Sequence, residues 1–92
     1  MATTNPTLTT SWAKLVDLGY EFFISLPFTS VTHIEIATVD SDEAPASGVS
    51  GHVLKGEAQE SLSRQLIGPG YVYARSRNGS LPVVLNAWEP AT

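Results

Sequence analysis

Polar and apolar residues alternate with a period of two along several short segments, which is the pattern of half-buried β-strands. The clearest segment is 31–39, VTHIEIATV, where β-branched residues dominate and favour an extended backbone. Turn residues separate the segments, and Pro27 ends the most aromatic of them. We predict strands over 12–18, 20–26, 31–39, 52–54, 71–76 and 80–88.

Glycine, proline and asparagine mark the turns between these segments. Gly68-Pro69-Gly70 predicts a tight turn, and Asn78-Gly79 predicts a two-residue hairpin, because both residues accept the positive φ of a type I′ turn. Pro82 cannot donate to a strand ladder, so we expect the strand that closes this hairpin to lie at an edge or to begin there. Residues 40–51, DSDEAPASGVSG, form the longest predicted loop.

Residues 56–67, GEAQESLSRQLI, fit two kinds of structure. Ala58, Leu62 and Leu66 are spaced as on one face of a helix, and the composition is rich in helix formers. Leu62, Arg64 and Leu66 also alternate as in a strand. The surrounding β pattern favours the strand.

The strands predict an all-β fold, a small antiparallel β-sandwich or barrel of about six to seven strands. With 92 residues the chain fits a single domain, which we place at 12–92. Residues 1–11 are small, polar and without a pattern, and they predict an extended N-terminal arm or, as the alternative, a loose tail. Such an arm can lie along a neighbouring protein, and its candidate contact residues are Thr3, Thr4, Thr7 and Thr9, followed by Trp12.

Charged residues make up only 15% of the chain, against about 25% in an average domain, and the formal net charge is −4. Few charges leave a neutral surface of the kind that an assembly buries. Five basic residues cannot form the cationic surface that a nucleic acid requires. The absence of cysteine excludes disulfides and thiol chemistry. We expect no signal peptide, because the N-terminus lacks a basic start and an apolar core, and no membrane helix, because no apolar run approaches about 18 residues.

Enzymatic chemistry has little support in these residues. Gly48-Val49-Ser50-Gly51-His52 resembles a nucleophile elbow, but its second glycine comes one residue early and no α/β pattern surrounds it. His33 and His52 have no metal-ligand spacing, and the acidic run at 40–43 lacks the ligand pattern of a calcium loop. We therefore predict a protein that is not an enzyme and that needs no cofactor or metal.

Arg75 and Arg77 fall on the same side of one predicted strand, where their guanidinium groups could anchor to carboxylates of a partner. The acidic loop offers Asp40, Asp42 and Glu43 as complementary groups. An oligomer held by these opposite charges is one hypothesis, and a soluble exposed sheet face is the other.

The order of four short motifs resembles that of small phage-encoded β-proteins of the virion. The matching residues are Ile34-Glu35-Ile36-Ala37, Ala44-Pro45, Gly51-His52-Val53-Leu54 and Gly70-Tyr71-Val72-Tyr73-Ala74-Arg75. The resemblance covers most of residues 12–88 and brings no catalytic residue. It implies a structural virion protein, made in the host cytoplasm, such as a decoration (cement) protein of the head or a tail accessory protein.

From the resemblance and the composition we expect a capsid decoration protein that binds and stabilises the head shell by protein–protein contacts. Its partner would be the major capsid protein or another virion protein, and the chain would form a homo-oligomer or a symmetric array. The alternative is a carbohydrate-binding accessory or adhesin module of the virion, because Tyr71, Tyr73 and Trp88 could stack on sugar rings. Burial of these three rings would favour the decoration protein, and their exposure around a groove would favour the adhesin.

Overall fold

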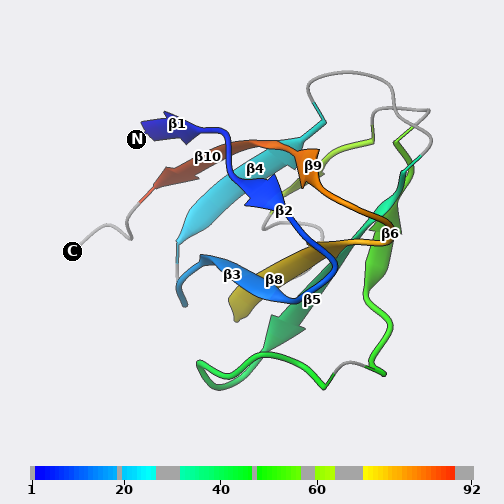
Figure 1. Cartoon of the computed structure of the whole chain (residues 1–92). Coiled ribbons are helices and arrows are strands. Elements are labelled where there is room, and N and C mark those ends of the chain that lie inside the picture. The colour runs from blue at the N-terminus through cyan, green and yellow to red at the C-terminus, as the bar shows by residue number, and fades with distance from the viewer. Residues whose placement is uncertain are drawn as a thin grey trace.

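The chain folds into three antiparallel β-sheets, as the computed structural model in Figure 1 shows. The structure describes residues 2–18, 20–26, 32–46, 48–56, 60–63 and 70–88, and these residues contain no helix. In chain order the strands are β1 (Ala2–Thr4), β2 (Thr7–Leu8), β3 (Ala13–Val16), β4 (Glu21–Ser25), β5 (Ile34–Val39), β6 (His52–Leu54), β7 (Leu62–Ser63), β8 (Tyr71–Ser76), β9 (Leu81–Pro82) and β10 (Val84–Trp88).

Two four-stranded sheets form the two layers of a sandwich (Figure 1). The first sheet has the strand order β1-β10-β4-β7, and the second has the order β3-β8-β5-β6. The short pair β2–β9 forms a third sheet. The predicted all-β sandwich is therefore confirmed. The described strands number ten rather than six or seven, because several are pairings of only two or three residues.

One hydrophobic core lies between the layers and receives side chains from all three sheets. The alternation of β4 shows how the sequence builds it: Phe22 and Ile24 are buried, whereas Glu21 and Phe23 are exposed. The largest fully buried hydrophobic side chains include members of all three sheets and are Leu8, Ile24, Ile34, Ile36, Val72 and Val83.

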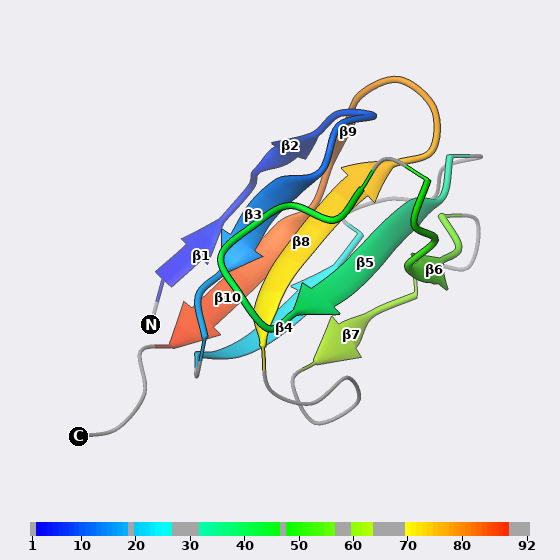
Figure 2. The same cartoon turned by 90° about the horizontal axis from the view of Figure 1, so that it is seen from below.

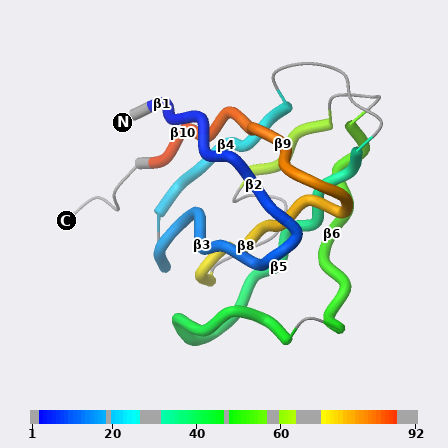
Figure 3. Tube along the Cα trace, viewed as in Figure 1, coloured from blue at the N-terminus to red at the C-terminus, as the bar shows by residue number. Residues whose placement is uncertain are grey.

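The N-terminal segment is extended, as predicted, but its strands add to sheets of its own chain. Figure 3 shows it running from β1 through β2 to β3, so it connects the three sheets in succession. β1 pairs with β10, and β2 pairs with β9. Leu8 is only 1% exposed and is part of the core. The N-terminal segment therefore packs as part of the sandwich and is not separated from it at residue 11.

The predicted hairpin between 71–76 and 80–88 does not form. The turn is present, with Gly79 at φ 67°, and the Ser76 hydroxyl donates a hydrogen bond to the Gly79 carbonyl. Both edges of β8 are already occupied, by β3 on one side and β5 on the other. The chain after Gly79 therefore leaves the second sheet: β9 pairs with β2 in the third sheet, and β10 pairs with β4 in the first. Pro82 lies in a two-stranded sheet and is thus at an edge, as expected.

Two local predictions have mixed outcomes. A register shift between Lys14 and Val16 places them opposite Tyr73 and Val72, so they lie on opposite faces of the sheet, whereas the alternation of a regular strand over 12–18 would place them on one face. In the segment 56–67, Leu62–Ser63 forms β7 against β4, which agrees with the strand interpretation at these two residues. Residues 57–59 and 64–67 of that segment lie outside the described part of the chain.

Replacing Leu8 by alanine should destabilise the whole sandwich, because the side chain fills the core at the point where the three sheets meet. We expect Leu8→Ala to lower the free energy of unfolding by about 2–4 kcal/mol, measured by urea denaturation. Leu18→Ala is the matched control, since Leu18 is 51% exposed, and it should change stability by about 0.5 kcal/mol or less. Equal effects of the two substitutions would contradict the assignment of the N-terminal segment to the core.

Candidate functional site

The loop between β5 and β6, residues 40–51, lies across the outer face of the second sheet; we call it the covering loop. Figure 2 shows it leaving the end of β5, passing in front of β3 and β8, and returning to β6. Residue 47 is outside the described part of the loop. Residues of the outer face beneath the loop are consequently buried, including Ala37 at 8% and Tyr73 at 6% exposure.

Asp42 attaches the first half of the covering loop to the sheet. Its carboxylate accepts a hydrogen bond from the Tyr73 hydroxyl at 2.9 Å and forms an ion pair with the Lys14 ammonium at 2.8 Å. The Lys14 ammonium nitrogen also lies 2.9 Å from a carboxylate oxygen of Asp17. The bond from Lys14, followed by that from Tyr73, lowers the pKa of Asp42. The pKa of Lys14 is raised, first by Asp17 and then by Asp42, and burial together with Asp42 raises the pKa of Tyr73.

Glu35 attaches the second half of the covering loop. Its carboxylate, on β5, accepts a hydrogen bond from the Gly51 amide at 3.0 Å and faces the Arg75 guanidinium at 3.4–3.5 Å. Arg75 also donates to the Val49 carbonyl at 2.9 Å, so one arginine joins the sheet to the loop. The Gly51 bond is the largest cause that lowers the pKa of Glu35, and the arginines add to it while burial opposes it.

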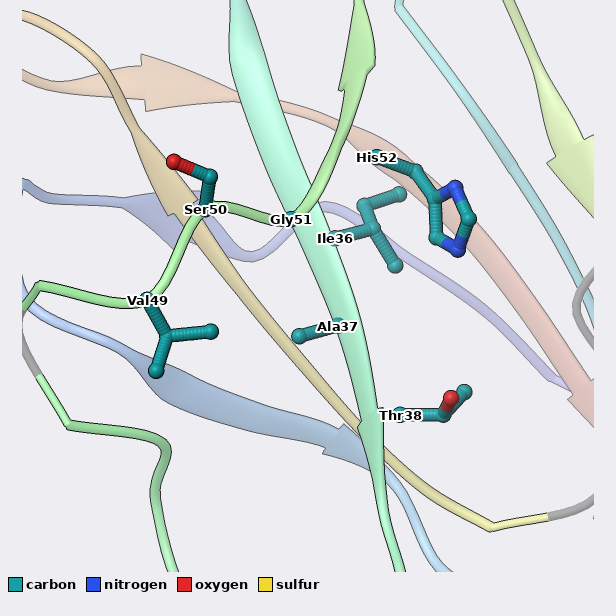
Figure 4. Close-up of a pocket in the computed structure, with 7 residues that line it drawn as sticks. All are labelled: Ile36, Ala37, Thr38, Val49, Ser50, Gly51 and His52. Carbon is teal, nitrogen blue, oxygen red and sulfur yellow. The ribbon is translucent and has the colours of Figure 1, made fainter.

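Position 51 requires a glycine because the covering loop lies very close to the backbone of β5 there. A Cβ atom at this position would lie 2.6 Å from the carbonyl oxygen of Ile36. Beside it, a shallow pocket of about 290 Å³ opens between β5 and the returning loop. Figure 4 shows Val49 and Ser50 of the loop and His52 of β6 among its lining residues.

The apparent nucleophile motif at 48–52 is a loop that enters a strand, as its sequence context indicated. Ser50 is exposed in the loop, and His52 begins β6. A nucleophile elbow requires a strand followed by a helix, and the described residues hold no helix.

Two of the groups that we proposed to pair between copies of the chain have partners within the chain itself. Arg75 pairs with Glu35, and Asp42 with Lys14 and Tyr73. Pairing of these groups between copies stays a prediction. Arg77 is 3.8 Å from Glu35 with 54% of its side chain exposed, and Asp40 and Glu43 are exposed on the loop.

Trp12 packs beneath the Arg75 guanidinium, 4.3 Å from the ring centre, at the edge of this cluster. Its indole N–H is buried without a hydrogen-bond partner among the described residues. Trp12 is thus half-buried and is not presented as an isolated contact residue. The four threonines of the N-terminal segment, Thr3, Thr4, Thr7 and Thr9, are exposed.

The outer face of the first sheet is different, because it is open and almost neutral. The strand register aligns Thr3, Asn86, Phe23 and Ser63 in one row across all four strands. Phe23 is 42% exposed at the centre of this row. Thr3 and Asn86 are joined by a side-chain hydrogen bond. We call this surface, with Val84, Ser25 and Glu21 beside the row, the neutral face; Glu21 is its one charged residue among those described.

Sequence reasoning did not single out Phe23 or Glu35 as site residues. The signal for Phe23 was its place on the polar side of the alternation in EFFIS, between Glu21 and Ser25. Glu35 had no such signal, because a glutamate in a half-buried strand is expected to face water.

Of the three rings considered for sugar binding, Tyr73 is buried and its hydroxyl is bonded to Asp42. It cannot stack on a ligand. Tyr71 is half-buried, with the Lys14 ammonium 5.8 Å from its ring centre. The side chain of Trp88 lies outside the described part of the structure.

No protein-family model matches the chain, and no curated protein or solved structure is significantly similar to it. Within the described ranges there is no helix long and apolar enough to cross a membrane. The same residues contain no group of three or more histidine, aspartate or glutamate side chains placed to hold a metal ion. The geometry itself therefore carries the functional argument.

Neutralising Glu35 should destabilise the fold more than neutralising an exposed acid of the covering loop. Glu35→Gln keeps the shape but removes the charge that faces Arg75, and we expect a loss of about 1–3 kcal/mol of unfolding free energy. Glu43→Gln is the matched control and should change stability by about 0.5 kcal/mol or less. Thermal unfolding of both variants measures the difference, and equal midpoints would refute the structural role of Glu35.

The protein should lose stability in acid as Glu35 and Asp42 become protonated. Both pKa values are lower in the folded chain than in the unfolded one, so the unfolded chain takes up protons first. The resulting stability is complete above the ordinary values of 4.5 and 3.8 and is lost as pH falls through the lowered ones. Urea unfolding between pH 6 and 2.5 should show this slope. The dependence of unfolding free energy on pH should be shallower in Asp42→Asn and in Glu35→Gln. If both variants keep the slope of the unmodified chain, Glu35 and Asp42 do not hold the covering loop through their charges.

Proposed function

We propose that this chain is a structural protein of a phage virion that binds the head shell through its neutral face and stabilises it. The observation that carries the proposal is the open outer face of the first sheet, with Phe23 exposed at its centre and Glu21 as its one described charge. The resemblance of the four sequence motifs to small virion proteins supplies the class of partner.

The distribution of charge supports this orientation. Lys14, Glu35, Asp42 and Arg75 all lie on the second sheet or on the loop that covers it, in the opposite layer from the neutral face. An acidic chain with a net charge of −4 can therefore approach a protein surface with its neutral face while the exposed acids of the covering loop stay in water. Interfaces of this kind place an aromatic side chain at the centre and polar groups around it.

Repetition would make even a small contact effective. A shell presents the same site many times, and chains that also touch one another gain from an already bound neighbour. The rigid sandwich suits this role, because a preformed face loses little conformational freedom on binding.

A charge placed at Phe23 should prevent attachment to the shell. We expect Phe23→Glu to reduce saturable co-sedimentation with empty, expanded heads of the phage that encodes the protein by at least about tenfold. Leu18→Glu is the matched control: Leu18 is 51% exposed and follows β3 of the second sheet. It should leave binding unchanged.

Isolated tails of the same phage provide the second control. Pelleting with heads and not with tails supports the head shell as partner. Equal loss of binding in the two variants would show that the neutral face is not the contact. Pelleting with tails alone, or binding to host glycans in its place, would overturn the proposal. Deletion of residues 1–11 is unsuitable, because it removes Leu8 from the core.

A further inference from the structure

The edge of β5 is left open over its second half. β6 pairs with β5 only at Ile34, Glu35 and Ile36, although β5 continues to Val39. At Gly51 the chain leaves this edge and becomes the covering loop. Beyond Ile36, no described strand lies on that side of β5.

The hydrogen-bond pattern identifies which backbone groups face the open edge. Arg77 donates its amide to the His33 carbonyl at 2.9 Å, so His33 and Arg77 are a hydrogen-bonded pair in the register of β5 and β8. Such pairs alternate along an antiparallel ladder. Ile34, Ile36 and Thr38 therefore direct their amide and carbonyl groups away from β8. β6 meets the first two, whereas those of Thr38 have no partner among the described residues.

The pocket of about 290 Å³ lies at this open edge. Figure 4 looks onto the edge and shows the chain crossing β5 at Gly51, with Ala37 and Thr38 uncovered beyond the crossing. Ala37 and Val49 lie on one side of β5, and Thr38 and His52 lie on the other. Ser50 lies on the same side as Ala37 and Val49, and Ile36 lies on the same side as Thr38 and His52, so both walls of the pocket carry apolar and polar groups.

We propose that an extended segment of a partner protein adds to β5 at this place. The segment runs antiparallel to β5, in line with β6, and its central residue exchanges two backbone hydrogen bonds with Thr38. Its side chains alternate between the wall that carries Val49 and the wall that carries His52. The crossing at Gly51 closes one end of the site, so the segment ends or turns away there.

Charge selects the sequence of the segment. Asp40 follows Thr38 by two residues and is exposed on an acidic chain. Because β5 ends at Val39, Asp40 lies just beyond the ladder, near the residue two positions before the one that meets Thr38. The partner segment therefore carries a lysine or arginine there, followed by small or β-branched residues. This site is on the second sheet and does not depend on the neutral face or on the proposed function.

Backbone N-methylation of a peptide distinguishes strand addition from any other mode of binding. The probe is the acetylated and amidated pentapeptide TKVTV, titrated into the ¹⁵N-labelled full-length protein and followed by NMR. We expect saturable shifts at the amides of Thr38 and the residues that line the pocket. N-methylation of the fourth peptide residue, whose amide faces Thr38, should weaken binding by at least about tenfold. N-methylation of the third residue, whose amide points away, should leave the affinity unchanged.

Two pairs of protein variants test the same geometry from the other side. Thr38→Pro removes an amide that no described residue accepts, so the β5–β8 ladder is kept and binding should be lost. Thr38→Val keeps the amide and should bind. Asp40→Lys should weaken binding of the lysine peptide, whereas Glu43→Lys, with the same change of charge on the same loop, should not.

Three results would overturn the inference. The first is an absence of shifts at millimolar peptide, and the second is equal weakening by the two N-methylated peptides, which would mean that side chains alone are bound. The third is a set of Thr38 shifts that appears on concentrating the protein without peptide, which would make a second copy of the chain the occupant. The unchanged spectrum of the remaining residues in Thr38→Pro verifies that this variant is folded.

Discussion

The burial of the Glu35 carboxylate is the constraint from which the rest of the second sheet follows. The residue is 7% exposed on the outer face of its sheet. An ionised group removed from water must be paired and hydrogen-bonded. Arg75 supplies the charge and Gly51 supplies an amide, but Gly51 belongs to the loop after β5. The loop can meet this requirement only by lying across the sheet, and Asp42 holds its other half in the same position.

This arrangement makes the two outer faces of the sandwich unequal. One face is closed by its own loop, and its charged groups neutralise one another. The other retains a partly exposed aromatic ring, Phe23, in a row with Thr3, Asn86 and Ser63. Among the described residues, the charged pairs of Lys14 with Asp42 and of Arg75 with Glu35 lie on the side of the second sheet. The proposed attachment to a shell uses the side that remains.

How far the sequence predicted this structure depended on whether a feature was local. β5 was evident because its β-branched residues are extended in any context, and β4 because its alternation is regular. The prediction of a hairpin at Asn78-Gly79 was wrong because the turn residues report only local conformation, whereas β8 pairs with β3 and β5, which are distant in the sequence.

The covering loop and the N-terminal segment share the opposite difficulty. Their small and acidic residues predict solvated chain, and only tertiary contacts give Asp42, Gly51 and Leu8 their places. Phe23 was visible in the pattern as one apolar residue on a polar face. That Phe23 lies in a row of neutral side chains follows only from the pairing of four strands, which the sequence alone does not give.

The most direct test of the proposed attachment is photo-cross-linking within assembled particles, with a photoreactive phenylalanine analogue placed at position 23 or at position 53. Both positions are partly exposed, and they lie on the outer sides of different sheets. The account predicts that position 23 cross-links to the major shell protein and that position 53 does not. Cross-linking to the shell from position 53 alone, or from position 23 to a tail protein, would contradict it.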